Sequence, residues 1–145
     1  MEKPTSPFLE KLLSSPAKPS QDLDRLAHAV IGAAIEVHRQ LGPGLLEPLY
    51  EEAFCIELAL RQIPFKRQPK VPVSYKGKRI GRNKLDVLVD GHLIVELKSV
   101  ERLAPIHSAQ IISYLRITGH QLGLLINFNV PVLKDGLKRV VLSRT

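Results

Sequence analysis

The apolar residues of this chain change their spacing near residue 62, and that change limits the folds that the chain can adopt. Between residues 20 and 61 apolar side chains recur every three or four positions, as they do along a helix that packs one face on a core. From Val71 onward they alternate with polar side chains, which is the period of a strand. The two periods in succession predict a mixed α/β domain in which helices cover a small sheet.

Two helices are expected before the first strand. The first is capped by Ser20 or Asp22 and ends at the Gly42-Pro43-Gly44 turn. The second starts near Glu47-Pro48, where a proline in the first turn loses no hydrogen bond, and reaches about Arg61. The stripes expected to face the core are Leu23, Leu26, Ala27, Val30, Ile31, Ala34, Ile35 and Leu41 in the first helix, and Leu49, Ala53, Ile56 and Leu60 in the second.

Strands and a third helix complete the expected domain. The third helix begins at Pro105 and ends at Gly119. A connector at Pro131–Lys138 precedes the last strand, and residues 1–20, rich in Pro, Ser and Lys, are expected to form a tail before a single domain at residues 21–145. The segments expected as strands are 71–75, Leu85–Val89, Leu93–Leu97, Leu122–Asn127 and Val140–Ser143.

Composition excludes several classes of protein. A length of 145 residues suits one domain, and no window approaches the roughly 18 consecutive apolar residues of a membrane span. The N-terminal segment lacks the apolar core and small-residue cleavage site of a secretion signal, so a cytoplasmic protein is expected. Cys55, the only cysteine, excludes an intrachain disulfide and a cysteine-ligated cluster, and it is expected in the core.

A basic run dominates the charge pattern. The chain has a formal net charge of +7, and no acidic residue lies between Arg61 and Lys84. Such a run suits contact with the phosphate backbone of a nucleic acid, or alternatively a solvated sheet edge whose lysines discourage pairing between sheets. The low aromatic content of 5% argues against a stacking platform for single strands. The residues expected to contact nucleic acid are Lys66, Arg67, Lys70, Lys76, Lys78, Arg79, Arg82 and Lys84.

Glu96 and Lys98 are the charged residues whose position most needs an explanation. They are two positions apart on an expected strand, so they point to one face, while Leu93, Val95 and Leu97 point to the other. A charged pair at the end of an apolar strand is costly unless water or a function requires it.

Asp86 joins this pair only if the preceding hairpin has a particular loop. A two-residue turn at Asp90-Gly91 pairs Asp86 with Val95 and places it on the face opposite Glu96. A three-residue loop that also includes His92 pairs Asp86 with Glu96. A shared site therefore requires the odd loop.

Two carboxylates and a lysine at one point suit phosphodiester hydrolysis. Carboxylate oxygens hold Mg²⁺ or Mn²⁺, which polarises the phosphate and lowers the pKa of bound water. A neighbouring lysine can orient that water or stabilise the developing negative charge. The alternative is a surface Glu–Lys pair with an unrelated aspartate, because the pattern alone is short.

Further segments resemble a known family. The segment from Gly44 to Tyr50 fits the pattern that names the GxxExxY proteins, a group within the PD-(D/E)xK nuclease superfamily, and the hairpin from Lys84 to Lys98 is similar to that family's metal-site hairpin. Gln110 to Tyr114 resembles the QxxxY element that several exonuclease-like branches carry on the next helix. The resemblance runs from about Leu26 to Val141 and includes Ile31–Glu36, His38, Leu41–Gly44, Leu124–Phe128 and Leu133–Gly136.

The resemblance implies a restriction-endonuclease-like αβββαβ core, a small mixed sheet flanked by helices with an extra N-terminal helix, and a site at the sheet edge. It also implies roles: Glu47, Asp86, Glu96 and the backbone carbonyl of Leu97 as ligands of Mg²⁺ or Mn²⁺, Lys98 as the catalytic lysine beside Asp86 and Glu96, and Gln110 and Tyr114 as residues that line the site.

Some of these residues also have plainer interpretations. Glu47 suits the positive end of a helix dipole, and Gln110 and Tyr114 can hydrogen-bond each other or the sheet edge. Glu51 is expected to be a surface acid, and a lone histidine such as His107 is usually structural or solvated. His38, near a helix end, is expected to be a polar or capping residue.

The function expected from all of this is metal-dependent hydrolysis of nucleic acid, DNA rather than RNA. One alternative is a non-catalytic nucleic-acid-binding or assembly module with the same fold, which would bind without turnover. Another is a metal-dependent hydrolase that acts on a smaller phosphate compound. A homodimer or a partner protein is a further possibility, because a second subunit would enlarge the surface with which so small a domain contacts a duplex.

Overall fold

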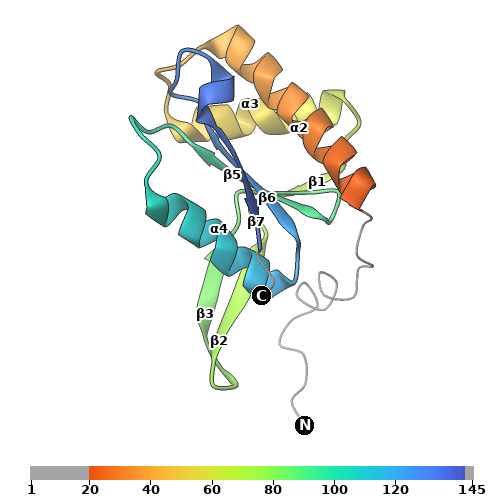
Figure 1. Ribbon diagram of the computed structural model, residues 1–145, viewed down its shortest axis with the longest axis vertical. Helices are drawn as coiled ribbons and strands as arrows, with labels where there is room; N and C mark the ends of the chain where they lie inside the picture. Colours follow the sequence, from red (N-terminus) through yellow and green to blue (C-terminus); the bar gives the residue numbers. More distant parts are fainter. Residues whose placement is uncertain (1–19, 143–145) are drawn as a thin grey trace.

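A mixed sheet forms the centre of the domain, in the strand order β1-β4-β5-β6-β7 (Figure 1). The computed structural model describes residues 20–142. Strands β5 and β6 are parallel, and the other neighbouring pairs are antiparallel. The bounds are β1 (Phe65–Arg67), β4 (Val87–Val89), β5 (Leu93–Lys98), β6 (Leu122–Asn127) and β7 (Leu137–Val141).

Helices cover both faces of this sheet, as Figure 1 shows. Helices α2 (Ser20–Leu41) and α3 (Glu47–Leu60) pack on one face, and α4 (Pro105–Thr118) packs on the other. The central strand β5 contributes alternate residues to the two clusters, with Val95 on the α2–α3 side and Ile94 on the α4 side. The mixed α/β architecture predicted from the sequence is confirmed.

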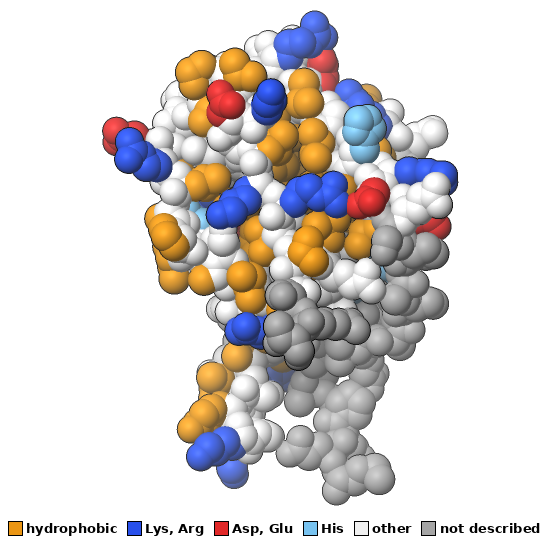
Figure 2. Space-filling model, in the orientation of Figure 1, with side chains coloured by type: hydrophobic (Ala, Val, Ile, Leu, Met, Phe, Trp, Pro, Cys, Tyr) orange, Lys and Arg blue, Asp and Glu red, His pale blue; other side chains and the backbone are white. Residues whose placement is uncertain are grey.

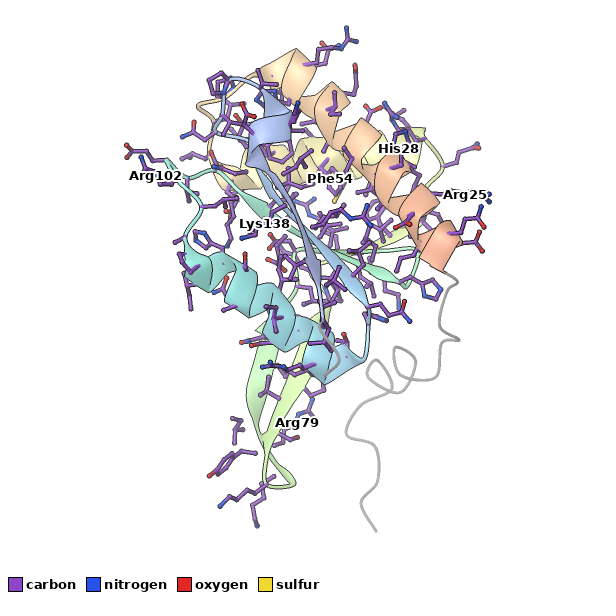
Figure 3. The ribbon with its side chains drawn as sticks, in the orientation of Figure 1. Arg25, His28, Phe54, Arg79, Arg102 and Lys138 are labelled. Carbon is purple, nitrogen blue, oxygen red and sulfur yellow. The ribbon has the colours of Figure 1, made fainter. Side chains whose placement is uncertain are left out.

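The core face of α3 differs from the predicted one. Leu49, Ile56 and Leu60 are 52%, 53% and 73% exposed, so these three predicted core residues face outward, whereas the fourth, Ala53, is partly buried against the core. Helix α3 carries two apolar stripes, and the inner one contains the aromatic residues; the Tyr50 ring stacks on Phe128 with centroids 4.5 Å apart. Figure 3 shows Phe54 among the side chains of this layer. The buried residues of α3 are Tyr50, Glu51, Phe54, Cys55 and Leu58, which confirms Cys55 as a core residue.

Helix α2 follows its predicted stripe for most of its length. Ile35 and Leu41 are nevertheless 47% and 41% exposed, whereas Val37, which was not part of the predicted stripe, is buried. His38 is also buried, and its Nε2 atom lies 2.7 Å from the carbonyl oxygen of Val130, which joins the helix to a distant loop. The N-terminal tail predicted for residues 1–20 lies almost wholly outside the described residues.

Some strands were not predicted, and others are displaced. Strand β1 was missed because it has only three residues, and β3 (Lys78–Lys84) was missed because it has no apolar alternation and is exposed throughout. The predicted Leu85–Val89 strand is confined to β4. The predicted Val140–Ser143 strand lies earlier, at β7, after a short 3-10 helix, η1 (Leu133–Gly136), and Ser143 itself is outside the described residues. Strand β6 and helix α4 lie within a residue of their predicted bounds.

A second, two-stranded sheet projects from the domain beyond α4. It consists of β2 (Lys70–Tyr75) and β3, which are antiparallel (Figure 1). Figure 2 shows basic and hydrophobic side chains along this projection, and Figure 3 labels Arg79 on it. Its inner end is anchored by Val71, which is buried in the cluster beneath α4. We refer to residues 70–84 as the arm.

Candidate active site

The loop between β4 and β5 determines which residues meet. Val89 pairs with Leu93, so the loop consists of three residues, 90–92. The first two of these have left-handed backbone angles, with φ of 52° and 68°. The odd loop is therefore present, and continuing the register places Asp86 opposite Glu96.

Asp86 and Glu96 are joined by direct contacts. The Asp86 amide donates to Oε1 of Glu96 at 3.1 Å, and the Leu97 amide donates to Oδ2 of Asp86 at 2.8 Å. Glu96 is only 5% exposed although it is a carboxylate. Such a buried acid needs a partner for its charge.

The two carboxyl groups change each other's protonation. Burial first, and then the charge of Asp86, raises the pKa of Glu96 to about 8. Burial also raises the pKa of Asp86, against the hydrogen bond from the Leu97 amide. The two groups also hydrogen-bond each other, so near neutral pH the pair shares a proton. A divalent cation can take the place of that proton.

Lys98 ends β5 beside this pair and is half-buried. Its positive charge lowers the pKa of Asp86, of Glu96 and of Glu47, so it lies within electrostatic range of all three carboxyl groups. The backbone of Lys98 is held by the Phe128 amide, which donates to the Lys98 carbonyl at 2.9 Å.

Glu47 is brought to the same place from α3. It is the first residue of that helix and is half-buried, and its carboxylate accepts a hydrogen bond from the Ser99 amide. Burial raises the pKa of Glu47, while the charge of Lys98 opposes the shift. The helix start is tied to the end of β5 a second time, because the Ser99 hydroxyl donates to the Leu45 carbonyl at 2.5 Å.

The turn before Glu47 is built around the Tyr50 hydroxyl. This hydroxyl donates to the Gly42 carbonyl at 2.5 Å and accepts from the Leu45 amide at 3.1 Å. Gly44 has φ of 100°, a backbone angle that favours glycine. Gly44 therefore bends the turn, Glu47 supplies the carboxylate, and Tyr50 fixes the turn to the helix.

Glu51 is buried, so its assignment as a surface acid was wrong. It is 6% exposed and accepts hydrogen bonds at 2.8 Å from Arg67 Nε and from Gln68 Nε2. Its charge contributes to the raised pKa values of Glu47 and Asp86. The spacing of Glu47 and Glu51, one helical turn apart, was the signal in the sequence that they face the same way.

Helix α4 places its three candidate residues in different surroundings. The Tyr114 hydroxyl donates to the Lys84 carbonyl at 3.3 Å, and the pKa of Tyr114 is raised by burial and by the charges of Glu96 and Asp86, which places it beside the carboxyl pair. Gln110 is exposed on the same helix. His107 is structural: its Nδ1 accepts from the Ala104 amide at 3.0 Å and caps the helix.

The predicted nucleic-acid contacts are divided between the arm and β1. Most of them are exposed on the arm. Arg67 instead forms ion pairs with Glu51 and Glu52, at 2.8 and 3.1 Å, so its charge already has acidic partners within the protein. The exposed basic residues of the arm are Lys70, Lys76, Lys78, Arg79, Arg82 and Lys84, and Lys66 is exposed on β1.

The donor set can be compared with what a divalent cation requires. Within residues 20–142 no three His, Cys, Asp or Glu side chains are arranged so that they could together hold a metal ion. The proton-sharing pair of Asp86 and Glu96 remains, with oxygen atoms only. Mg²⁺ commonly binds to one or two carboxylates and completes its shell with waters and substrate phosphate, so this pair fits such an ion.

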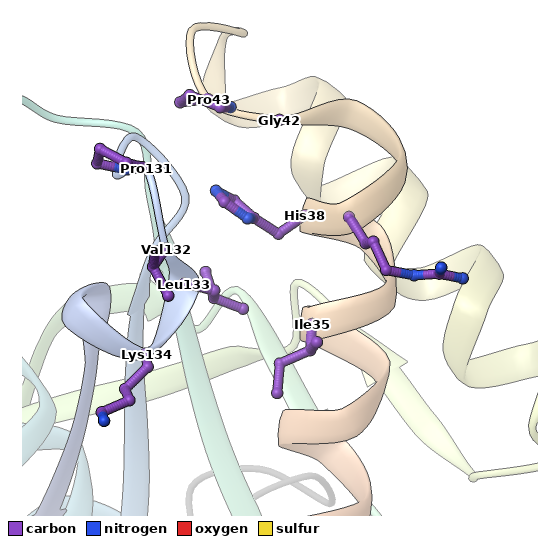
Figure 4. Close-up of a pocket in the computed structure, with 9 residues that line it drawn as sticks. Ile35, His38, Gly42, Pro43, Pro131, Val132, Leu133 and Lys134 are labelled. Carbon is purple, nitrogen blue, oxygen red and sulfur yellow. The ribbon is translucent and has the colours of Figure 1, made fainter.

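A pocket of about 430 Å³ lies away from the carboxyl groups, between the end of α2 and the loop before η1 (Figure 4). His38 faces it from the helix, and Pro131 and Val132 face it from the loop. None of the residues that line it belongs to β4, β5 or α4, so it is separate from the candidate site. Among residues 20–142, no helix is both long and apolar enough to cross a membrane.

One family model of known proteins matches most of the chain. The family model described as the PD-(D/E)XK nuclease superfamily matches residues 24–140, which confirms the expected restriction-endonuclease-like fold. A search of curated proteins gave no match. Among solved structures, the chain is similar to an alkaline exonuclease (LHK-Exo) from Laribacter hongkongensis, with a TM-score of 0.46 and 11% identity over 93% of this chain and 75% of that chain.

Proposed function

This chain belongs to the PD-(D/E)XK nuclease superfamily, and from that premise we propose that it hydrolyses phosphodiester bonds of DNA with the help of Mg²⁺ or Mn²⁺. The observation that carries the proposal is the register that sets Asp86 opposite Glu96, with Lys98 beside them. A buried carboxyl group that shares a proton with a half-buried one is costly to maintain unless the pair holds a cation or takes part in a reaction.

Asp86, Glu96 and the Leu97 carbonyl would hold the ion. When bound, the ion would neutralise phosphate charge and lower the pKa of a bound water. Lys98 would orient the attacking water or stabilise the charge that develops on the phosphoryl group. Tyr114 would hold the Lys84 carbonyl and so the chain just before Asp86, and Gln110 would line the same side of the site.

Glu47 would be the acidic residue supplied by the helix. Its contact with the Ser99 amide keeps it within range of Lys98, so it would help to position that lysine or a metal-bound water. Gly44, Glu47 and Tyr50 together support membership of the GxxExxY group as part of the proposal. A cytoplasmic location and a partner protein or second copy for targeting stay predictions.

The experiment that tests the proposal is cleavage of labelled DNA and RNA, single- and double-stranded, with Mn²⁺, Mg²⁺ or EDTA. Wild type is compared with Lys98→Ala and with Lys138→Ala, an exposed lysine of β7 that serves as a matched control. We expect metal-dependent cleavage by wild type and by the control, and a loss of at least about 100-fold in Lys98→Ala.

Other results would redirect the assignment. If wild type binds nucleic acid but leaves every substrate intact, the chain is a binding module. If Lys98→Ala cuts as fast as wild type, the activity does not come from this site.

A further inference from the structure

The arm is the outer half of one continuous two-stranded ribbon. β1 pairs with β4, and β2 pairs with β3 as far as Val73, in the same register, which shifts by one residue between Val73 and Ser74; hydrogen bonds bridge the gap between the two strand pairs. The Gln68 amide donates to the Asp86 carbonyl at 2.8 Å, and the Leu85 amide donates to the Pro69 carbonyl at 3.0 Å. The ribbon therefore leaves the main sheet at Asp86, the residue assigned to the active site.

The base of the arm is fixed to the helix that lines the site. Val71 is fully buried in a cluster with Ile111 and Leu115 of α4. The Tyr114 hydroxyl holds the Lys84 carbonyl on the opposite strand. The arm is thus mounted on the same elements as the carboxyl pair, so a ligand gripped by the arm would be held at a set position relative to Asp86.

All of the charge carried by the arm's own residues is positive. No acidic residue occurs between Arg61 and Lys84, and every residue of β3 is exposed. Lys70 pairs directly with Lys84 across the strands, and like charges in that position repel. A polyanion along the arm would relieve this repulsion.

The outer end of the arm also exposes apolar side chains. Tyr75 and Ile80 are 61% and 67% exposed, and the Lys76 ammonium lies 5.4 Å from the centroid of the Tyr75 ring. The tip is a two-residue turn at Lys76-Gly77 with φ of 48° and 78°, which keeps the end of the ribbon narrow. Tyr75 is the only aromatic residue of the arm, too few for a stacking surface along a single strand.

From these observations we propose that the arm enters the major groove of double-stranded DNA, with its cations on the phosphates and its apolar tip within the groove. The major groove of B-DNA is about 12 Å wide and admits a two-stranded ribbon, whereas that of A-form RNA is too narrow for side chains to read. The six residues of β2, at about 3.3 Å each, give a reach of about 20 Å. The inference rests on the proposed function and adds the substrate class: duplex DNA.

Binding measured without cleavage tests the arm separately from the nuclease activity. A triple variant, Lys76→Ala, Lys78→Ala and Arg82→Ala, is titrated in EDTA with duplex and single-stranded DNA of one sequence, by fluorescence anisotropy at several salt concentrations. The control is Lys134→Ala with Lys138→Ala, two exposed lysines outside the arm. We expect the triple variant to lose at least tenfold more affinity for the duplex than for the single strand. The salt slope, which is the steepness with which the logarithm of duplex affinity falls with the logarithm of salt concentration, should be lower by about 3.

A second variant, Ile80→Ser, tests the groove contact without a change in charge. It should weaken duplex binding severalfold and leave the salt slope as in wild type, because no phosphate contact is lost. Circular dichroism and thermal unfolding establish that each variant is folded, and a triple variant that fails to fold leaves Ile80→Ser to decide.

The inference is overturned if the arm variants weaken duplex and single-strand binding equally, or if they behave as the control does. Equal loss would mean a general electrostatic surface, and no loss would mean that the nucleic acid lies elsewhere. Duplex binding that depends on the arm, in a protein that cleaves no substrate, would support the inference while the proposed catalytic function fails.

Discussion

Asp86 lies opposite Glu96 on neighbouring antiparallel strands, with its amide nitrogen 3.1 Å from Oε1 of Glu96. This relationship depends on the three-residue loop at 90–92, because a shift of one residue turns every side chain of a strand to its other face. The candidate site is thus set by loop length as much as by the identity of its acids.

Deletion of Gly91 tests that dependence. The remaining two-residue loop would shift the register by one and turn Asp86 away from Glu96, so we expect nuclease activity to be lost. Gly91→Ala is the control: it keeps the register and strains a residue with φ of 68°, which should lower stability by about 1 kcal/mol and leave activity measurable. If the deletion variant is folded and fully active, Asp86 and Glu96 do not act together.

Replacement of Glu96 by Gln tests how much the carboxyl pair lowers the stability of the folded protein when it is ionised. Burial raises the pKa of Glu96 to about 8 in the folded protein from 4.5. The protonated Glu96 side chain therefore makes its full contribution to stability below pH 4.5, and that contribution is lost as pH rises through 8. At pH 8 without metal, Glu96→Gln should therefore melt at least about 4 °C above wild type. Mn²⁺ should raise the melting temperature of wild type more at pH 8 than at pH 5, and that of the variant little.

The order of helices and the site hairpin could be read from the sequence because each depends on local pattern. The stripe of α2, the cap at Gly119 and the alternation of β5 are such patterns. The sequence did not decide whether Asp86 pairs with Glu96, because a two-residue and a three-residue loop were both compatible with Asp90-Gly91-His92. That choice depends on backbone angles which the sequence alone does not fix.

The rest depended on partners far away in the chain. Glu51 is buried because Arg67 and Gln68, sixteen and seventeen residues later, supply its hydrogen bonds, and the strand that ends at Arg67 was too short to be predicted. The inward stripe of α3 was missed because an apolar stripe also lies on its outward side, and only packing against residues such as Phe128 distinguishes the two.

Leu58 and Leu60 form a matched test of the corrected core. Leu58 is fully buried and Leu60 is 73% exposed on the same helix. Leu58→Ala should lower the free energy of unfolding by about 2–5 kcal/mol, whereas Leu60→Ala should change it by less than about 0.5 kcal/mol. Urea unfolding of the two variants measures both values, and the reverse order would restore the stripe predicted from the sequence.

Tyr50→Phe tests the turn that carries Glu47. The substitution keeps the ring on Phe128 but removes the hydroxyl that bonds to Gly42 and Leu45. We expect a loss of about 1–3 kcal/mol in stability and a lower rate of cleavage, because the start of α3 is no longer fixed. A variant that loses stability but cleaves at the wild-type rate would show that the turn does not position Glu47.

His120 gives the fold a sensitivity to acid that is independent of the active site. It is buried beside β6, its Nε2 atom has no hydrogen-bond partner among the described residues, and burial followed by the charge of His92 lowers its pKa to about 4 from 6.5. The folded protein therefore holds the neutral ring, so this stabilising contribution is complete above pH 6.5 and is lost as pH falls through 4. The full loss is about 3 kcal/mol. Urea unfolding at pH 7 and pH 4 should show a smaller difference for His120→Phe than for wild type, and an equal difference would mean that the ring takes up its proton without opening the fold.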